Sequence, residues 1–381
     1  MPEIVRQLPA LDTLPGLLII MIALSGEFPA TMVSRLPGAD TYKEFAVKRL
    51  KRDKLIRSFY RDGLRGLRLT STAKKLLLTA YPIWFQPTLT GNTETNYLKS
   101  EITRRLRLHR MAEMLLVMNN TGISTFPWEK PAIFQTTSLP PDAFHGQPAY
   151  YSSREVKEIG PQSTKIRGSR ATGILLTDGG IFVVYNTAAT EMKWEYKAEM
   201  RLKALLQIEL CQQRLPDRFR NAQQDAIVFG SSMRQMEWLM GIGSKATRSF
   251  FVLDGNFEHF YFLTNDRYGE VLLQLLCEPE LKAMLDEILM ENLSESRAGW
   301  PIVNDGFDES EAPVLFGYTC DMPRIKHFDT ALSLHGQTGT VICFDYQEET
   351  LRNICGPRVS LQCISFAAFE RSVLHLSEES D

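Results

Sequence analysis

Residues 41–69, TYKEFAVKRLKRDKLIRSFYRDGLRGLRL, combine a dense positive charge with two different hydrophobic periods. Over residues 41–53 the apolar side chains recur at helical spacing, which predicts an amphipathic helix whose other side is basic. Thr41 and Glu44 have the spacing of a capping box, in which a hydroxyl and a carboxylate satisfy reciprocal backbone amides. We therefore expect this helix to begin at Thr41.

After this helix the hydrophobic period changes to two. Residues 55–60 and 64–69 read as strands, and Arg61-Asp62-Gly63 lies between them. An Asp-Gly pair between alternating runs predicts a β-hairpin. Thr70 can cap a further helix that carries Lys74.

Two more helices are expected upstream, over residues 14–25 and, from Pro29 onward, 29–36. The order helix, short helix, basic helix, basic hairpin, helix is that of a winged helix-turn-helix. Such a module places its basic helix in the major groove of DNA and its hairpin against phosphates or the minor groove. A winged helix that mediates only protein contacts is the alternative. The expected DNA-binding residues are Lys43, Lys48, Arg49, Lys51, Arg52, Arg57, Arg61, Arg65, Arg68 and Lys74.

The charge distribution supports a polyanionic partner. Residues 41–110 contain 17 basic and 5 acidic residues, a balance of +12, whereas the whole chain of 381 residues has a net charge of −2. The rest of the chain is therefore acidic, and such asymmetry favours a nucleic-acid partner for the basic segment.

The composition, 44% hydrophobic and 23% charged, excludes a disordered or fibrous chain. The most apolar run, residues 14–24, is too short for a membrane span, and its flanks do not match a signal peptide, so we expect a cytoplasmic protein with no membrane association.

Three domains are expected, covering residues 1–90, 96–293 and 294–381, with a linker at 82–95 and a long helix at 96–119. Residues 171–177 and 181–186 read as a hairpin around Asp178-Gly179-Gly180, and 194–212 as a helix. Short strands at 226–229, 250–253 and 259–263 precede a long helix over 268–292. An acidic connector then leads into strands at 313–317, 340–344 and 359–363 with helices at 324–334 and 347–355 between them. This alternation predicts a multi-domain α/β protein.

In this order of elements, and in the segments 150–156 (YYSSREV) and 170–185, the chain resembles the replication-relaxation family. Those proteins are encoded on plasmids and conjugative elements. The resemblance covers roughly residues 14–263 and implies a second domain with a restriction-endonuclease-like fold. Where such folds carry Pro-Asp and then Glu-x-Lys, this chain has Thr172-Gly173 and Val183-Val184-Tyr185, so the metal-binding carboxylates are missing.

An alternative set of nuclease residues is Asp178 as a metal ligand with Glu195 and Lys197 as a Glu-x-Lys pair. A Mg²⁺-dependent nuclease needs carboxylates that converge on a hard cation. Asp178, however, lies in an expected turn, and residues two apart on a helix point in different directions. The six cysteines show no zinc-binding spacing, and no phosphate loop is present, so no cofactor or metal is expected.

Together these patterns predict a DNA-binding accessory protein of a mobile genetic element, such as a plasmid or conjugative transposon, with a catalytically degenerate nuclease-like domain. Its expected partners are double-stranded DNA and replication or transfer proteins of the same element. Two alternatives stay open: an active Mg²⁺-dependent nuclease, and a winged-helix transcription regulator whose α/β region senses a small ligand.

Overall fold

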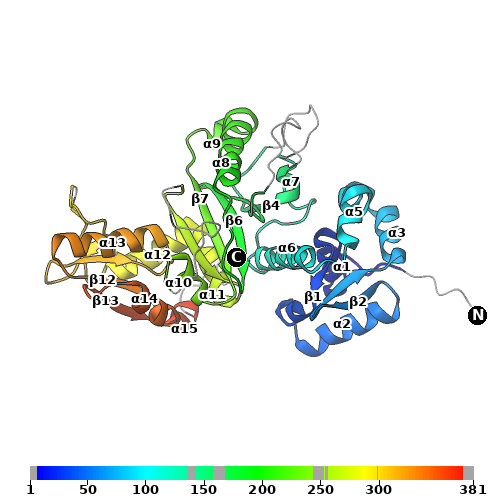
Figure 1. The fold of residues 1–381 in the computed structure, drawn as a ribbon, viewed down its shortest axis with the longest axis horizontal. Helices are drawn as coiled ribbons and strands as arrows, with labels where there is room; N and C mark the ends of the chain where they lie inside the picture. The colour runs from blue at the N-terminus through cyan, green and yellow to red at the C-terminus, as the bar shows by residue number, and fades with distance from the viewer. Residues whose placement is uncertain are drawn as a thin grey trace, which may run out of the picture. The chain divides into compact units, whose positions relative to one another are not determined.

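The computed structural model describes residues 7–134, 143–157, 168–242, 253, 256–297 and 299–371. The chain divides into two compact units, residues 1–131 and 132–381 (Figure 1). Both combine helices with β-sheet, so the expected α/β class is confirmed. The division differs from the three expected ranges: the long basic helix belongs to the first unit, and residues 294–371 pack within the second.

The first unit is a small three-stranded sheet with helices before and after it. Its elements are α1 (Leu14–Ser25), β1 (Phe28–Pro29), the 3₁₀ helix η1 (Ala30–Arg35), α2 (Asp40–Arg52), β2 (Ile56–Arg61), β3 (Leu64–Leu69), α3 (Ser71–Ala80), α4 (Pro82–Leu89), α5 (Gly91–Leu98) and α6 (Ile102–Asn120). The strands are antiparallel in the order β1-β3-β2.

Local sequence signals explain several boundaries of this unit. The hairpin turns at Asp62 and Gly63, which have φ angles of 53° and 75°. Two consecutive positive φ values define the tight turn that matches strand twist, and Asp-Gly is a favoured pair for it. The Thr70 hydroxyl accepts a hydrogen bond from the Ala73 amide at 3.2 Å and caps α3, as expected.

Four expectations for this unit are wrong. Helix α2 begins at Asp40 after Ala39 without a side-chain cap, so Thr41 and Glu44 form no capping box. The short helix is 3₁₀, and Pro29 ends β1 instead of opening that helix. The expected linker at 82–95 consists of α4 and most of α5, because Pro82 occupies a first helical position rather than marking a loop. The long helix begins at Ile102 instead of 96.

The core of the first unit forms around α1, which is apolar on nearly all sides. Ile19, Met21 and Ala23 of α1 are fully buried and pack with Phe28, Leu67 and Leu116 from β1, β3 and α6. A helix that is hydrophobic all round belongs in the centre of a domain. The elements that carry the positive charge therefore lie on a continuous apolar core.

The second unit contains two five-stranded sheets. The first has the order β4-β5-β6-β7-β8, antiparallel from β4 to β6 and parallel from β6 to β8. Its elements are β4 (Ala149–Ser152), α7 (Ser153–Lys157), β5 (Gly173–Leu176), β6 (Ile181–Ala188), α8 (Tyr196–Leu205), the π-helical segment η3 (Leu206–Arg214), α9 (Pro216–Phe219), β7 (Gln224–Gly230), α10 (Arg234–Leu239), β8 (Phe260–Thr264), α11 (Arg267–Cys277) and α12 (Pro279–Met290).

This sheet confirms the expected hairpin around 178–180 and the strands near 226–229 and 259–263. The strand expected at 250–253 falls mostly outside the described residues. The single helix expected over 268–292 is two helices, because Pro279 restricts Glu278 to an extended backbone and starts α12.

The second sheet has the order β13-β12-β11-β10-β9, with β11 to β13 parallel. Its elements are β9 (Ser294–Glu295), β10 (Gly306–Phe307), β11 (Pro313–Phe316), α13 (Met322–His335), β12 (Gly339–Phe344), the 3₁₀ turn η4 (Asp345–Gln347), α14 (Glu348–Ile354), β13 (Val359–Ile364) and α15 (Phe366–Phe369).

The two sheets share one hydrophobic core. Leu315 and Val341 belong to the same buried cluster as Val183 and Phe262, and the Phe262 amide donates to the Cys320 carbonyl. The C-terminal strands therefore form a sheet of their own within the second unit. None of the helices described in the structure combines the length and hydropathy needed to cross a bilayer.

Candidate nucleic-acid interface

Helix α2 presents a basic face opposite the core. Ala46 and Leu50 are buried, whereas Lys48, Arg49 and Arg52 are exposed. The three cations have only surface partners: Lys48 pairs with Glu44 at 3.2 Å, and Arg49 and Arg52 share Asp53 at 3.7 Å and 3.4 Å. Exposed pairs of this kind contribute roughly 0–1 kcal/mol, so they give way readily to a phosphate.

The hairpin continues this basic face. Tyr60 of β2 and Arg65 of β3 lie directly opposite each other, and both are exposed. Burial lowers the pKa of Lys51 at the end of α2, and the nearby charge of Arg65 lowers that pKa further. Neither Lys51 nor Arg65 has an ion-pair partner among the described carboxylates. The basic side chains of α2 and of the hairpin tip, Lys48, Arg49, Lys51, Arg52 and Arg65, are here named the α2–hairpin surface.

Arg57 and Arg61 lie on the face of β2 opposite to that of Tyr60, since side chains alternate along a strand. Both are exposed at the surface. Arg61 is tethered, because its guanidinium donates to the Ser100 hydroxyl at 2.6 Å and lies 3.6 Å from Asp62.

Three expected DNA contacts are corrected by the structure. The Lys43 amine is buried and donates to the Ser34 carbonyl at 2.6 Å and to Asp40 at 3.0 Å. Lys74 is 15% exposed and pairs with Glu94 at 2.6 Å. Arg68 is 4% exposed and pairs with Glu27. Each cation is already neutralised within the fold, so none is available to a phosphate.

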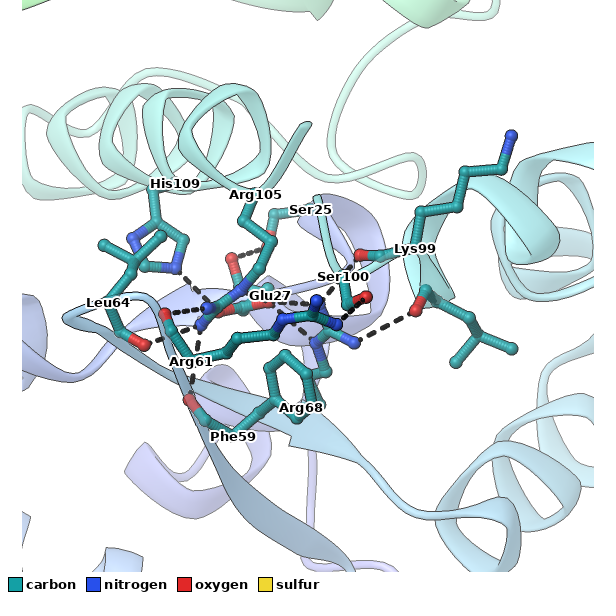
Figure 2. A network of polar contacts seen from close by, with 11 residues as sticks. Ser25, Glu27, Phe59, Arg61, Leu64, Arg68, Lys99, Ser100, Arg105 and His109 are labelled. Atoms are coloured by element: carbon teal, nitrogen blue, oxygen red, sulfur yellow. Dashed lines mark hydrogen bonds and ion pairs between the residues drawn. The ribbon is translucent and has the colours of Figure 1, made fainter. Parts of the chain in front are cut away.

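The partner of Arg68, Glu27, is the centre of a buried ionic network (Figure 2). Its carboxylate accepts hydrogen bonds from Arg68 Nε at 2.7 Å and from Arg105 Nη2 at 2.5 Å, and it lies 2.9 Å from His109 Nε2. Arg105 and His109 both come from α6, one turn apart on the same side of the helix. The network therefore joins β1, β3 and α6.

Arg105 also holds the backbone of the hairpin. Its guanidinium donates to the carbonyls of Arg61 at 2.8 Å, Leu64 at 2.9 Å and Phe59 at 3.3 Å, as Figure 2 shows. The guanidinium carbons of Arg68 and Arg105 lie over the Phe59 ring, 3.9 Å and 4.6 Å from its centre. The hairpin is thus fixed against α6 through one face. On the other face Ile56 and Leu67 are buried in the core, and Tyr60 and Arg65 near the turn are exposed.

The network keeps Glu27 ionised at neutral pH by lowering its pKa. Burial raises the pKa of Glu27, but the hydrogen bonds from His109 and Arg105 and the charge of Arg68 outweigh it and lower the pKa from 4.5 to about 2. Gly66 makes room for this carboxylate, because a Cβ there would lie 2.1 Å from Glu27 Oε1. The sequence gives little warning of this role: Glu27 lies between the helices expected at 14–25 and 29–36, and its two arginine partners lie 41 and 78 positions away.

The three nuclease candidates in the second unit do not converge. Asp178 lies in the turn before β6 and pairs with Arg218 of α9. Glu195 and Lys197 are exposed at the start of α8, after β6 has ended. One turn further along, Glu199 accepts a hydrogen bond from Tyr185, midway along β6, at 2.9 Å. Asp178 thus precedes β6 and pairs with Arg218, whereas Glu195 and Lys197 follow the strand.

The positions where the resembled fold carries its metal ligands are structural here. The Thr172 hydroxyl donates to the Val184 carbonyl at 2.9 Å, and Val183, Val184 and Tyr185 are buried in β6. Over the described ranges, no three His, Cys, Asp or Glu side chains gather as they would around a metal ion.

Sequence reasoning missed two buried polar groups of the second unit. Glu199 accepts hydrogen bonds from Ser169, the Arg170 amide and Tyr185, which fixes α8 to the sheet. His259 Nδ1 lies 2.6 Å from Asp321, and this hydrogen bond raises the pKa of His259 above its usual value. A cavity bordered by Ser153, Ser169 and Leu202 measures about 10 Å³, room for a single water molecule rather than a metabolite.

Comparisons of the chain with protein-family models, with curated proteins and with solved structures found no match.

Proposed function

We propose that the first unit is a winged helix-turn-helix that binds double-stranded DNA through the α2–hairpin surface. The element order supports this proposal, because α1, β1, η1, α2 and the β2–β3 hairpin follow one another as in winged helices that place the third helix in the major groove. The observation that carries it is a pair of neighbouring cations: the charge of Arg65 lowers the pKa of Lys51, and neither side chain has an ion-pair partner among the described carboxylates.

Two like charges held close without a partner destabilise a fold unless an anion neutralises them. The chain can neutralise buried cations, as Arg68 and Arg105 show with Glu27. Lys51 and Arg65, by contrast, have no such partner among the described carboxylates, which favours an external anion for the α2–hairpin surface. A rigid hairpin also suits this use, because its contacts with Arg105 fix the position of Arg65 relative to α2.

The second unit, in this proposal, is a restriction-endonuclease-like domain without catalysis that couples DNA binding to partner proteins. The order antiparallel hairpin, helix α8, parallel strand β7 supports that fold. The separation of Asp178 from Glu195 and Lys197 supports the absence of a nuclease centre. A role for the protein on a mobile genetic element rests on the sequence resemblance and completes the proposal.

Fluorescence anisotropy of the full chain with a labelled 30-base-pair duplex tests the proposal. The double variant Arg52→Glu/Arg65→Glu should bind at least ~10-fold more weakly than the wild type at low salt, because it replaces two phosphate contacts by repulsion. Both side chains are exposed, so the fold should be unaffected.

The matched control is Lys326→Glu, an exposed cation on α13 of the second unit that changes charge in the same direction. This variant should bind DNA like the wild type. The proposal fails when the wild-type protein does not bind duplex at low salt, or when the double variant and the control bind equally well.

A further inference from the structure

Helix α2 also exposes two aromatic side chains beside its cations. Tyr42 is 47% and Phe45 is 52% exposed, and their rings stack with centroids 6.4 Å apart at 22°. Adjacent exposed rings form an apolar patch, and patches of this kind on soluble proteins mark binding surfaces. Nothing in the core requires them, because Ala46 and Leu50 already fill the buried side of α2.

The rings and two of the cations form one stripe along the helix. Tyr42, Phe45, Arg49 and Arg52 follow at intervals of three, four and three residues, which places them on one side of α2. The rings occupy the N-terminal half of the stripe and the guanidinium groups the C-terminal half. In helix-turn-helix complexes the N-terminal residues of the recognition helix contact base edges.

We propose that Tyr42 and Phe45 read the C5 methyl groups of thymine in the major groove, which makes them specificity-determining residues of the DNA binding proposed above, on which this inference rests. The thymine methyl is the apolar feature that base edges present in the major groove, and aromatic side chains contact it directly. Phe45 has no hydrogen-bonding atom in its side chain, so it distinguishes bases by this methyl group alone.

Charge complementarity favours DNA over a second copy of the chain as the occupant of this patch. In a two-fold interface both copies bury the same surface patch. Pairing two copies through the whole stripe would place Arg49 and Arg52 of both copies in one interface, where Asp53 is their ion-pair partner among the described residues. A phosphate backbone beside the bases instead neutralises both arginines.

The test begins with selection of bound sequences from a randomised 20-base-pair duplex library by the full-length protein. Selected duplexes should carry thymine at one or more fixed positions. Replacing these thymines by deoxyuridine removes only the methyl group and should weaken binding about 4-fold per contacted methyl. The double variant Tyr42→Ala/Phe45→Ala should bind the thymine and uracil duplexes with equal affinity.

Ile83→Ala is the control, because Ile83 is 85% exposed on α4, outside the stripe, and its loss should leave the discrimination unchanged. A wild-type protein that does not bind any duplex refutes the proposed function itself. Binding that is insensitive to uracil, or discrimination that persists in Tyr42→Ala/Phe45→Ala, overturns this inference alone. A dimer in sedimentation velocity without DNA that Phe45→Ala abolishes also overturns it, because a second copy would then occupy the patch.

Discussion

The substitution Glu27→Gln removes the carboxylate that pairs with two guanidinium groups, both fully or almost fully buried. The amide keeps the size of the carboxylate but leaves Arg68 and Arg105 without a compensating charge. Breaking a buried ion pair in this way costs about 3–5 kcal/mol. The shift in the pKa of Glu27 from 4.5 to about 2 gives a similar value, about 3 kcal/mol at neutral pH.

Hydrogen–deuterium exchange of the full chain measures this loss where it occurs. Slowly exchanging amides of β3 and α6 should exchange about 100-fold faster in Glu27→Gln, which corresponds to a loss of about 3 kcal/mol in their opening free energy. Amides of β7, in the second unit, should keep their rates, because the network does not reach them.

Glu44→Gln is the matched control, since it removes a carboxylate from an exposed pair with Lys48 on α2. Glu44→Gln should change the opening free energy of the same amides by less than about 1 kcal/mol. An effect of Glu27→Gln as small as that of the control would show that the ionic network does not hold the hairpin to α6, and the reasoning above would be wrong.

Three further predictions follow from the same structure. The folded pKa of Glu27 lies below its ordinary value of 4.5, so the stabilisation from Glu27 is present above pH 4.5 and is lost as the pH falls toward about 2. In urea unfolding, the free energies of unfolding of the wild type and of Glu27→Gln should therefore converge over this range and differ by a constant amount above it. The hydrogen bond to Asp321 raises the pKa of His259, so its stabilisation is present below pH 6.5 and is lost as the pH rises through the raised pKa; in an NMR titration Asp321→Asn should lower the midpoint of His259, and an unchanged midpoint would contradict the pairing. Incubation of supercoiled plasmid with Mg²⁺ or Mn²⁺ should give no nicking, and any nicking that Asp178→Ala or Glu195→Ala abolishes would contradict the separation of these residues.

The sequence predicts those parts of the first unit that depend on neighbouring residues. Asp62-Gly63 adopts the positive φ angles that its chemistry favours, and Thr70 caps α3 as its position suggests. Pro82 and Pro279 are also local signals, but both begin helices here, whereas the expectations treated Pro82 as part of a linker and placed Pro279 inside a helix.

Contacts between distant residues explain the rest. Arg65 and Arg68 lie three positions apart on one strand and look alike in sequence, yet one is exposed and the other buried. Their difference follows from strand alternation together with Glu27, which lies 41 positions before Arg68. A count of basic residues therefore overstates the proposed DNA-binding surface, because only the fold separates the cations that hold it together from those exposed at the surface.

The most direct test of the central claim, that the α2–hairpin surface contacts DNA phosphates, is the salt dependence of duplex binding. The slope of log Kd against log salt concentration for the wild type should fall by about 1 in Arg65→Gln, because one phosphate contact is lost, and should not change in Lys326→Gln. An unchanged slope in Arg65→Gln, or an affinity that does not depend on salt in the wild type, would contradict the account.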